Sequence, residues 1–220
     1  KEYWVQHIVT AGSGCTDTAF LPVYVYPDPA AGFSLPSTVC AGSTVSVNDT
    51  SKGNGLDYRW LSSGGVVISD TAADEPTLFF PDNQAPNADT TYTITLIITS
   101  EDGCKDTAIQ NVLIHARPKA DFSVDSLQCG SYVGLLNDSS QFNGPGPLTY
   151  SWSVLPSVSS AGGATLSSAT AASPTLTIPA PSVDSVTYRI TLVVTDSYGC
   201  TDEHLDSIKV YARPTSLFTV

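Results

Sequence analysis

The sequence predicts an all-β protein made of small sandwich domains in tandem, and a repeated motif is the main reason. The motif begins with Tyr, continues as an alternating apolar run and ends in Gly-Cys, with 12 residues from Tyr to Cys in each copy. It occurs at Tyr3–Cys15, Tyr92–Cys104 and Tyr188–Cys200. The cysteines of successive copies are 89 and 96 residues apart (104 − 15 and 200 − 104). This period is too long for a solenoid repeat and suits one small β-sandwich domain.

Composition also favours strands over helices. Val, Ile, Thr, Tyr and Phe fill the periodic segments, and Gly, Pro, Asn, Asp and Ser separate them. The 220 residues include 9 Lys and Arg against 21 Asp and Glu, a formal net charge of −12. Such a chain repels nucleic acid and anionic membranes, because both are bound by clustered Lys and Arg. Since no apolar run approaches roughly 20 residues, we expect no membrane insertion in this segment.

The period divides the chain into two whole repeats and two fragments. We expect residues 1–28 to be the C-terminal part of a preceding repeat, with its last two strands, and residues 214–220 to be the first strand of a following one. The whole repeats are expected at 29–117 and 118–213. Each motif is followed by an Asp-rich strand and then by Pro-x-x-x-Phe, at Pro29/Phe33, Pro118/Phe122 and Pro214/Phe218.

Period-two alternation predicts the strands of the repeat at 29–117, here lettered A, B, C, C′, E, F and G. They are Ala31–Leu35, Thr44–Val47, Asp57–Leu61, Val66–Ile68, Thr77–Phe80, Thr91–Thr99 and Thr107–His115. The second repeat follows the same order, with extra length in loops such as Ser157–Ala172. A Trp on strand C (Trp60, Trp152) and a Tyr that opens strand F (Tyr92, Tyr188) predict an immunoglobulin-like sandwich with these side chains in its core.

The five cysteines occupy two recurrent positions of the repeat. Three of them end the motif in the turn between strands F and G, and two, Cys40 and Cys129, follow strand A. Recurrent positions indicate either disulfides or metal ligands, but close-spaced pairs such as Cys-x-x-Cys are absent from the sequence. Disulfides are therefore favoured, and with them an oxidising, extracellular location.

The geometry of a sandwich limits which cysteines can pair. Cys40 and Cys104 would lie at opposite ends of one repeat, about 25 Å apart, whereas a disulfide needs Cα atoms within about 7 Å. Head-to-tail stacking of repeats would instead bring Cys40 to Cys200, so this disulfide is predicted. Cys15, Cys104 and Cys129 would then pair with repeats outside the sequence. The alternative, Cys40–Cys104 with Cys129–Cys200, applies if the topology is different.

Several short motifs recur in both repeats: Pro-x-Ala-x-Phe-Ser, Asn-Asp-Thr/Ser-Ser, Tyr-x-Trp, Tyr-x-Ile-Thr-Leu-x-Val/Ile-Thr and Gly-Cys-x-Asp. Together they resemble PKD (polycystic-kidney-disease) repeats, in particular the cysteine-bearing arrays of very large Bacteroidota cell-surface and gliding-associated proteins. The resemblance covers nearly the whole chain and implies a structural role at the cell surface. One departure is clear: the Gly-Asp-Gly that often follows the strand-C Trp in the family is missing after Trp60 and Trp152.

No arrangement of residues in the sequence indicates catalysis. The histidines, His7, His115 and His204, occupy unrelated positions of the repeat, and no Gly-x-Ser-x-Gly nucleophile motif occurs. We therefore expect no enzymatic activity, no resident metal and no obligatory cofactor.

Calcium is the alternative, because carboxylates cluster near the turn between strands F and G. Asp102 with Asp106, or Asp196 with Asp202, could supply the oxygen ligands that calcium prefers. Solvated aspartates at turns and strand ends are the simpler interpretation.

The resemblance also implies O-glycosylation at Asp-Ser/Thr followed by a small or aliphatic residue. Roughly two such triplets are expected by chance in a chain of this composition, and the sequence has more. The candidate acceptors are Thr18, Thr71, Thr90, Thr107, Ser126, Ser185 and Ser207. Asn48 and Asn137 match the N-glycan sequon, but their recurrence in the repeat favours a turn after strand B.

These observations predict a structural segment of a long extracellular bacterial surface protein or filament, such as a stalk or adhesin, stiffened by inter-repeat disulfides. Its partners would be neighbouring repeats of the same chain and, in a filament, copies of itself. One alternative is a carbohydrate- or ligand-binding accessory module that uses exposed aromatics such as Trp4 and Tyr198. Another is a set of repeats that follow a secreted enzyme. The sequence does not name a ligand.

Overall fold

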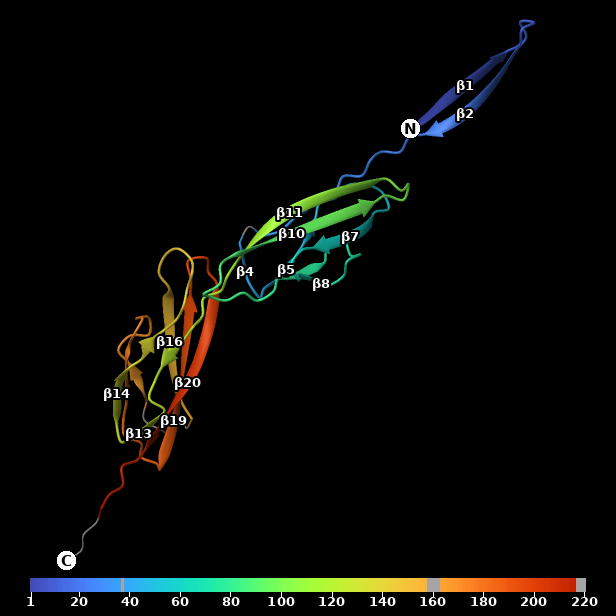
Figure 1. Ribbon diagram of the computed structural model, residues 1–220. Coiled ribbons are helices and arrows are strands. Elements are labelled where there is room, and N and C mark those ends of the chain that lie inside the picture. The colour runs from blue at the N-terminus through green and yellow to red at the C-terminus, as the bar shows by residue number, and fades with distance from the viewer. Residues whose placement is uncertain (37, 158–162, 217–220) are drawn as a thin grey trace, which may run out of the picture. The chain divides into compact units, whose positions relative to one another are not determined.

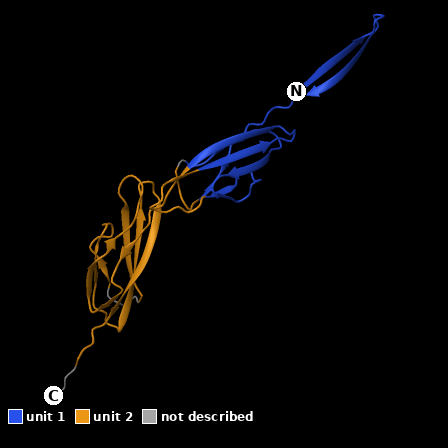
Figure 2. Cartoon of the chain, viewed as in Figure 1, with its two compact units in different colours: residues 1–37, 44–79, 92–112 blue, residues 38–43, 80–91, 113–220 orange. Residues whose placement is uncertain are grey.

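The structure, a computed structural model, describes residues 1–36, 38–157 and 163–216, and within these ranges the chain forms β-strands and turns without a helix. It divides into two compact units, shown in Figure 2. The first unit comprises Lys1–Ser37, Thr44–Phe79 and Tyr92–Val112. The second comprises Thr38–Ser43, Phe80–Thr91 and Leu113–Val220. The described part of the chain contains no helix long and apolar enough to cross a membrane.

The first unit begins with a hairpin of β1 (Glu2–Thr10) and β2 (Thr16–Tyr24), paired antiparallel so that Trp4 lies opposite Pro22 (Figure 1). Both strands are exposed along their length, apart from the half-buried Pro22. This exposure follows from their number, because two strands alone cannot bury a face. Trp4, for example, is 63% exposed.

The strands of the first expected repeat form two packed sheets and a short edge pair. The short pair is β3 (Phe33–Ser34) with β6 (Asn48–Asp49). The smaller sheet has the order β5-β9-β8, with β5 at Thr44–Ser46, β9 at Thr77–Phe79 and β8 at Val67–Ile68. The larger sheet has the order β4-β11-β10-β7, with β4 at Val39–Cys40, β11 at Lys105–His115, β10 at Thr90–Thr99 and β7 at Asp57–Ser62.

Alternation along β10 builds the core of the first unit as the sequence predicts. Its inward residues Tyr92, Ile94, Leu96 and Ile98 are buried, and the residues between them are half-buried. Trp60 on β7 is 1% exposed. Its indole Nε1 donates a hydrogen bond to the carbonyl oxygen of Ala73 at 2.8 Å, which satisfies the only polar atom of this buried side chain.

The second unit has the same plan. Its short pair is β12 (Phe122–Ser123) with β15 (Asn137–Asp138), and its smaller sheet is β14-β18-β17, at Tyr132–Leu135, Thr175–Ile178 and Thr165–Leu166. The larger sheet is β13-β20-β19-β16, at Leu127–Cys129, Thr201–Tyr211, Ser185–Thr195 and Thr149–Pro156. Trp152 on β16 donates from Nε1 to the carbonyl oxygen of Ala171 at 2.9 Å, as Trp60 does to Ala73.

The phenylalanine of Pro-x-x-x-Phe packs edge-on against the strand-C tryptophan in both units. Phe33 and Trp60 have ring centroids 5.0 Å apart at 78°, and Phe122 and Trp152 have centroids 5.0 Å apart at 71°. The recurrent aromatic motif is therefore one repeated core contact, and the predicted all-β, immunoglobulin-like fold is confirmed.

Two features of the fold differ from the sequence prediction. The short strands β4 and β13 pair parallel with the ends of β11 and β20, and they were missed because two or three residues carry no readable alternation. The Asn-Asp motif forms the short strands β6 and β15 and not simply a turn. Residues 158–162 of the predicted loop and 217–220 of the predicted final strand lie outside the described residues.

The Asn-Asp-Thr/Ser-Ser motif has a structural explanation. Asp49 accepts hydrogen bonds from the backbone nitrogen of Ser51 at 3.1 Å, from the Ser51 hydroxyl at 2.6 Å and from the Tyr58 hydroxyl at 3.0 Å. Burial and this contact with Asp49 raise the pKa of Tyr58 to about 12. Tyr150 beside Asp138 has its pKa raised by the same causes.

Candidate functional site

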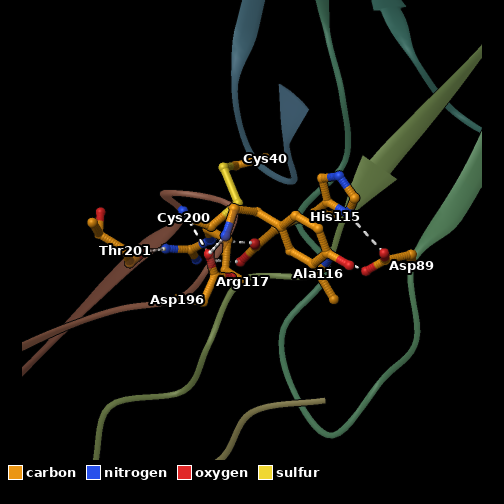
Figure 3. Close-up of a disulfide and its surroundings, with 10 residues drawn as sticks. Cys40, Asp89, His115, Ala116, Arg117, Asp196, Cys200 and Thr201 are labelled. Atoms are coloured by element: carbon orange, nitrogen blue, oxygen red, sulfur yellow. Dashed lines mark hydrogen bonds and ion pairs between the residues drawn. A yellow bond between two sulfur atoms is a disulfide. The ribbon is translucent and has the colours of Figure 1, made fainter. Parts of the chain in front are cut away.

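A disulfide between Cys40 and Cys200 joins parts of the chain that are 160 residues apart, with a Cα–Cα distance of 5.6 Å (Figure 3). This is the pair that the sequence argument selects, and both cysteines belong to the second unit. Cys15, Cys104 and Cys129 are free. The alternative pairing through Cys40–Cys104 is therefore absent. That the three free cysteines pair with repeats outside the sequence stays a prediction.

Cys40 is positioned by a parallel backbone pairing. β4 lies beside the end of β11 with Cys40 opposite His115, and the next amide, that of Ala41, donates to the carbonyl of His115 at 2.9 Å. The other strand-A cysteine has the same environment: Cys129 on β13 lies opposite Tyr211, and the next amide, that of Gly130, donates to the Tyr211 carbonyl at 2.8 Å. Both cysteines thus end a short strand that the last residues of strand G hold in place.

Cys200 is positioned by the Gly-Cys turn. The amide of Asp196 donates to the carbonyl of Cys200 at 3.0 Å, and the amide of Gly199 donates to the carbonyl of Asp196 at 3.1 Å. Gly199 has φ +84°, a left-handed conformation in which a side chain is unfavourable. The turn at 100–104 is closed in the same way, with Gly103 also at φ +84°. The recurrent glycine is therefore required by the turn.

The aspartate of Gly-Cys-x-Asp fixes the start of strand A. Asp202 accepts a hydrogen bond at Oδ2 from the backbone nitrogen of Ala120 at 2.9 Å, and Asp106 accepts one from Ala31 at 2.7 Å. This contact with Ala31 is the main cause that lowers the pKa of Asp106. Two motifs that are far apart in the sequence, Gly-Cys-x-Asp and Pro-x-Ala, therefore form one repeated contact in the fold.

Arg117 links two carboxylates beside the disulfide. Its Nε and Nη2 donate to the two oxygens of Asp82 at 3.0 and 2.9 Å, and its Nη1 lies 3.3 Å from Oδ1 of Asp202. The same Nη1 donates to the carbonyl of Thr201 at 3.5 Å (Figure 3). Hydrogen bonding to Arg117 lowers the pKa of Asp82, and the carboxylate raises the pKa of Arg117 in return.

His115 is enclosed between a carboxylate and an aromatic ring. Its Nδ1 lies 2.7 Å from Oδ2 of Asp89. The other carboxylate oxygen of Asp89 accepts a hydrogen bond from the backbone nitrogen of Ala116 at 2.9 Å. The ring of Tyr198 stacks on the imidazole, with centroids 3.6 Å apart and planes 7° apart. Tyr198 is half-buried, so the expectation that it is an exposed aromatic for carbohydrate binding is wrong. It packs at the disulfide instead.

The aspartates considered as calcium ligands are mostly engaged by protein donors. Asp202 and Asp106 hold backbone amides, and Asp196 accepts the amides of Tyr198 and Cys200 at its Oδ1, both at 2.9 Å. The Oδ2 of Asp196 is buried without a hydrogen-bond partner. Within the described ranges, no group of three or more His, Cys, Asp and Glu side chains is arranged to hold a metal ion.

The candidate glycosylation acceptors differ in accessibility. Thr18, Thr71, Thr107, Ser126 and Ser207 are exposed, whereas Thr90 and Ser185 are half-buried. Thr90 also accepts a hydrogen bond from Asn83 at 3.3 Å. Two of the triplet aspartates, Asp89 and Asp106, have structural contacts of their own, so these two triplets have an explanation that does not involve a sugar.

The side chains around the disulfide were not predicted from the sequence. No site was predicted around Arg117 or Asp82, and Asp89 was considered only as part of the candidate glycosylation triplet at Thr90. One pattern was available, because Ala-Arg-Pro recurs at 116–118 and 212–214. A recurrent arginine in a short linker of an acidic chain indicates a charged contact there.

Comparisons with known proteins do not assign a family. No protein-family model matches the chain, and no curated protein matches it. Among solved structures, it resembles protocadherin gamma B2 extracellular cadherin domains 1–5, at 13% identity and a TM-score of 0.32, over 98% of this chain and 46% of that one. The eight N-terminal immunoglobulin domains of Down syndrome cell adhesion molecule match at 12% identity and a TM-score of 0.43, over 95% of this chain and 28% of that one.

The human desmocollin-1 ectodomain matches at 13% identity and a TM-score of 0.34, over 96% of this chain. The chain spans less than half the length of each of these three structures. At such identities and scores, the assignment of the fold rests on the strands and core contacts described above.

Proposed function

We propose that this chain is a structural segment of a long extracellular surface protein or filament, a stalk or adhesin built from PKD-like, immunoglobulin-like repeats of Bacteroidota type. The observation that carries the proposal is the disulfide between Cys40 and Cys200. Its cysteines come from two different expected repeats, so it ties one repeat covalently to the next. Disulfides persist in oxidising surroundings, which supports an extracellular location.

The contacts around the disulfide support a fastening role. Arg117 forms ion pairs with both Asp82 and Asp202, and His115, which lies opposite Cys40, stacks on Tyr198. These polar groups pair with one another and with backbone amides, and they present no nucleophile with an adjacent base. We therefore assign the site a structural role and expect no catalytic activity from this segment. In the full protein the free cysteines would fasten further repeats in the same manner.

The proposal can be tested by measuring how widely the conformations of the chain vary in solution with and without the disulfide. Small-angle X-ray scattering of the oxidised protein and of the double variant Cys40→Ala/Cys200→Ala gives the distribution of the radius of gyration in solution. The proposal expects a narrower distribution for the oxidised protein. The variant Cys104→Ala removes a free cysteine and should match the wild type. Equal widths for the wild type and the double variant would reject a stiffening role.

A binding module remains the second candidate, and one observation favours it. Trp4, unlike Tyr198, is exposed. A module of this kind would bind oligosaccharide through Trp4, and the binding would be lost in Trp4→Ala. We rank it second because the other aromatic side chain proposed for this role is engaged at the disulfide.

A further inference from the structure

A groove on the outer face of the larger sheet of the second unit is not explained by the structural role. It has a volume of about 560 Å³ and is lined by Leu155, Pro156, Ser157, Thr187, Arg189, Leu205 and Ser207. These residues come from β16, β19 and β20, apart from Ser157, which directly follows β16. The volume falls within the range of small-ligand sites, which is about 300–1,000 Å³.

The register of the three strands places Arg189 in the middle of the groove. On β19 it lies opposite Leu155 of β16 on one side and opposite Ser207 of β20 on the other. Residues that face each other in this way have Cβ atoms about 5 Å apart. Leu155 is 65% and Leu205 51% exposed. Arg189 therefore lines the groove together with two aliphatic side chains that the core does not use, Leu155 directly opposite on β16 and Leu205 diagonally placed on β20.

The charge of the groove is opposite to that of the chain. Arg189 forms no ion pair among the described residues. Lys209 adds a second cation on the same face, since it pairs with Thr187 in the adjacent row, and its ammonium lies 4.8 Å from the ring centroid of Tyr211. In a chain with a net charge of −12, an unpaired arginine with a lysine nearby favours an anionic ligand.

The first expected repeat lacks this groove chemistry at the matching position. There the strand-F residue after the recurrent tyrosine is Thr93, and its hydroxyl donates a hydrogen bond to Oδ1 of Asn111 at 2.9 Å. Strand C is also shorter: β7 has six residues and β16 has eight. The two added residues supply Leu155 and Pro156. The groove is therefore a local feature of the second repeat and not a consequence of the fold.

We propose that this groove binds an acidic carbohydrate, with the carboxylate of a uronic acid on Arg189. A guanidinium binds a carboxylate through two parallel hydrogen bonds. The aliphatic side chains of Leu155, Pro156 and Leu205 offer an apolar surface for the C–H face of a pyranose ring. The hydroxyls of Thr187 and Ser207 suit the hydroxyls of a sugar. The Ser157 oxygen already accepts a hydrogen bond from the backbone nitrogen of Thr187 at 3.2 Å, but its hydroxyl can still donate to a sugar. An acidic peptide would leave these hydroxyls without partners. The proposal does not depend on the stalk function.

The experiment is an NMR titration of the 220-residue chain with tetragalacturonate, with neutral maltotetraose as the comparison ligand. Tetragalacturonate should shift the amide signals of Leu155, Arg189 and Ser207, and maltotetraose should not. The substitution Arg189→Thr copies the first repeat, and it should weaken binding about tenfold to a hundredfold, the loss expected when hydrogen bonds to a charged group are removed. Arg59→Thr removes an exposed arginine of β7 and serves as the matched control, with unchanged affinity expected.

Three outcomes would overturn the proposal. One is the absence of any shift at these amides, and another is equal weakening by Arg189→Thr and Arg59→Thr, which would mean unspecific charge attraction. The third is a tetraglutamate peptide that binds as tightly as tetragalacturonate with the same dependence on Arg189. That result would reject recognition of the sugar and leave a site for carboxylates in general.

Discussion

Removal of the Cys40–Cys200 disulfide should destabilise the second unit, and the size of the effect can be worked from the length of the closed loop. The cysteines are 160 residues apart. In the chain-entropy account, a loop of this length gives about 5 kcal/mol of stabilisation through the unfolded state. If only the chain after Val112 unfolds, the free loop is about half as long, and halving a loop changes the value by only about 0.6 kcal/mol.

Measured losses for native disulfides run from about 2 to 5 kcal/mol, so we expect a loss in this range for Cys40→Ala/Cys200→Ala. For a unit of this size, the expected fall in Tm is on the order of 10–20 °C. The assay is urea unfolding followed by circular dichroism, with calorimetry for Tm, on the oxidised wild type, the reduced wild type and the double variant. Reduced wild type and double variant should agree.

The variant Cys104→Ala controls for the loss of a thiol that forms no bond, and its midpoint should match that of the wild type. Addition of reductant to the double variant should have no effect. A difference of less than about 1 kcal/mol between the oxidised wild type and the double variant would refute the reasoning, because even a 15-residue loop is expected to give about 3 kcal/mol.

Four further results are expected. Arg117 holds the pKa of Asp82 below its usual value. The pair therefore stabilises the fold at pH values above the normal aspartate pKa and loses this effect as the pH falls through the lowered pKa. In unfolding experiments at decreasing pH, the stability difference between wild type and Arg117→Met should shrink, and a growing difference would contradict the pair. Tyr58 beside Asp49 has a pKa of about 12, against about 10 for a tyrosine in the unfolded chain. Its contribution to stability is therefore complete below pH 10 and is lost as the pH rises towards 12. An NMR titration in which Tyr58 ionises together with the exposed tyrosines would contradict this. A metal chelator should leave Tm unchanged in a thermal scan, whereas a drop of more than about 10 °C would indicate a bound ion, since a ligand at 100 times its Kd stabilises by about 2.7 kcal/mol. Protein from the native source should carry sugar on the exposed Asp-Ser/Thr acceptors outside the groove, which are Thr18, Thr71, Thr107 and Ser126, and an intact mass equal to the 23.1 kDa of the bare chain would end that hypothesis.

The strands of the core could be predicted from the sequence because alternation is a local property. On β10 and β19 every second side chain is buried, and a period of two residues can be read without any knowledge of the partners. The same holds for the turns, since a glycine with a positive φ is required wherever the Gly-Cys motif closes a hairpin. The internal repetition allowed the repeated core contacts to be predicted, because positions that recur with one period must occupy equivalent places in each repeat.

Contacts over long sequence distances were beyond the reach of these local signals. The pairing of β4 with β11 involves too few residues to show a pattern, and the hydrogen bond from Ala120 to Asp202 spans 82 residues. The cysteine pair is an intermediate case, because its selection combined the repeat period with the known shape of a sandwich. Neither the repeat period nor the shape of a sandwich indicated which side chains Arg117 would contact.

By itself, the sequence determined the fold class, the repeated core contacts and the positions of the turns, since each depends on residues close in the chain or on a fixed period. Only the tertiary structure decided that Tyr198 stacks on His115 and that Arg117 joins Asp82 to Asp202. It also decided that Arg189 lines a groove together with Leu155 and Leu205. Such contacts depend on register and strand length, and these are settled when whole sheets pack rather than by the preferences of single residues.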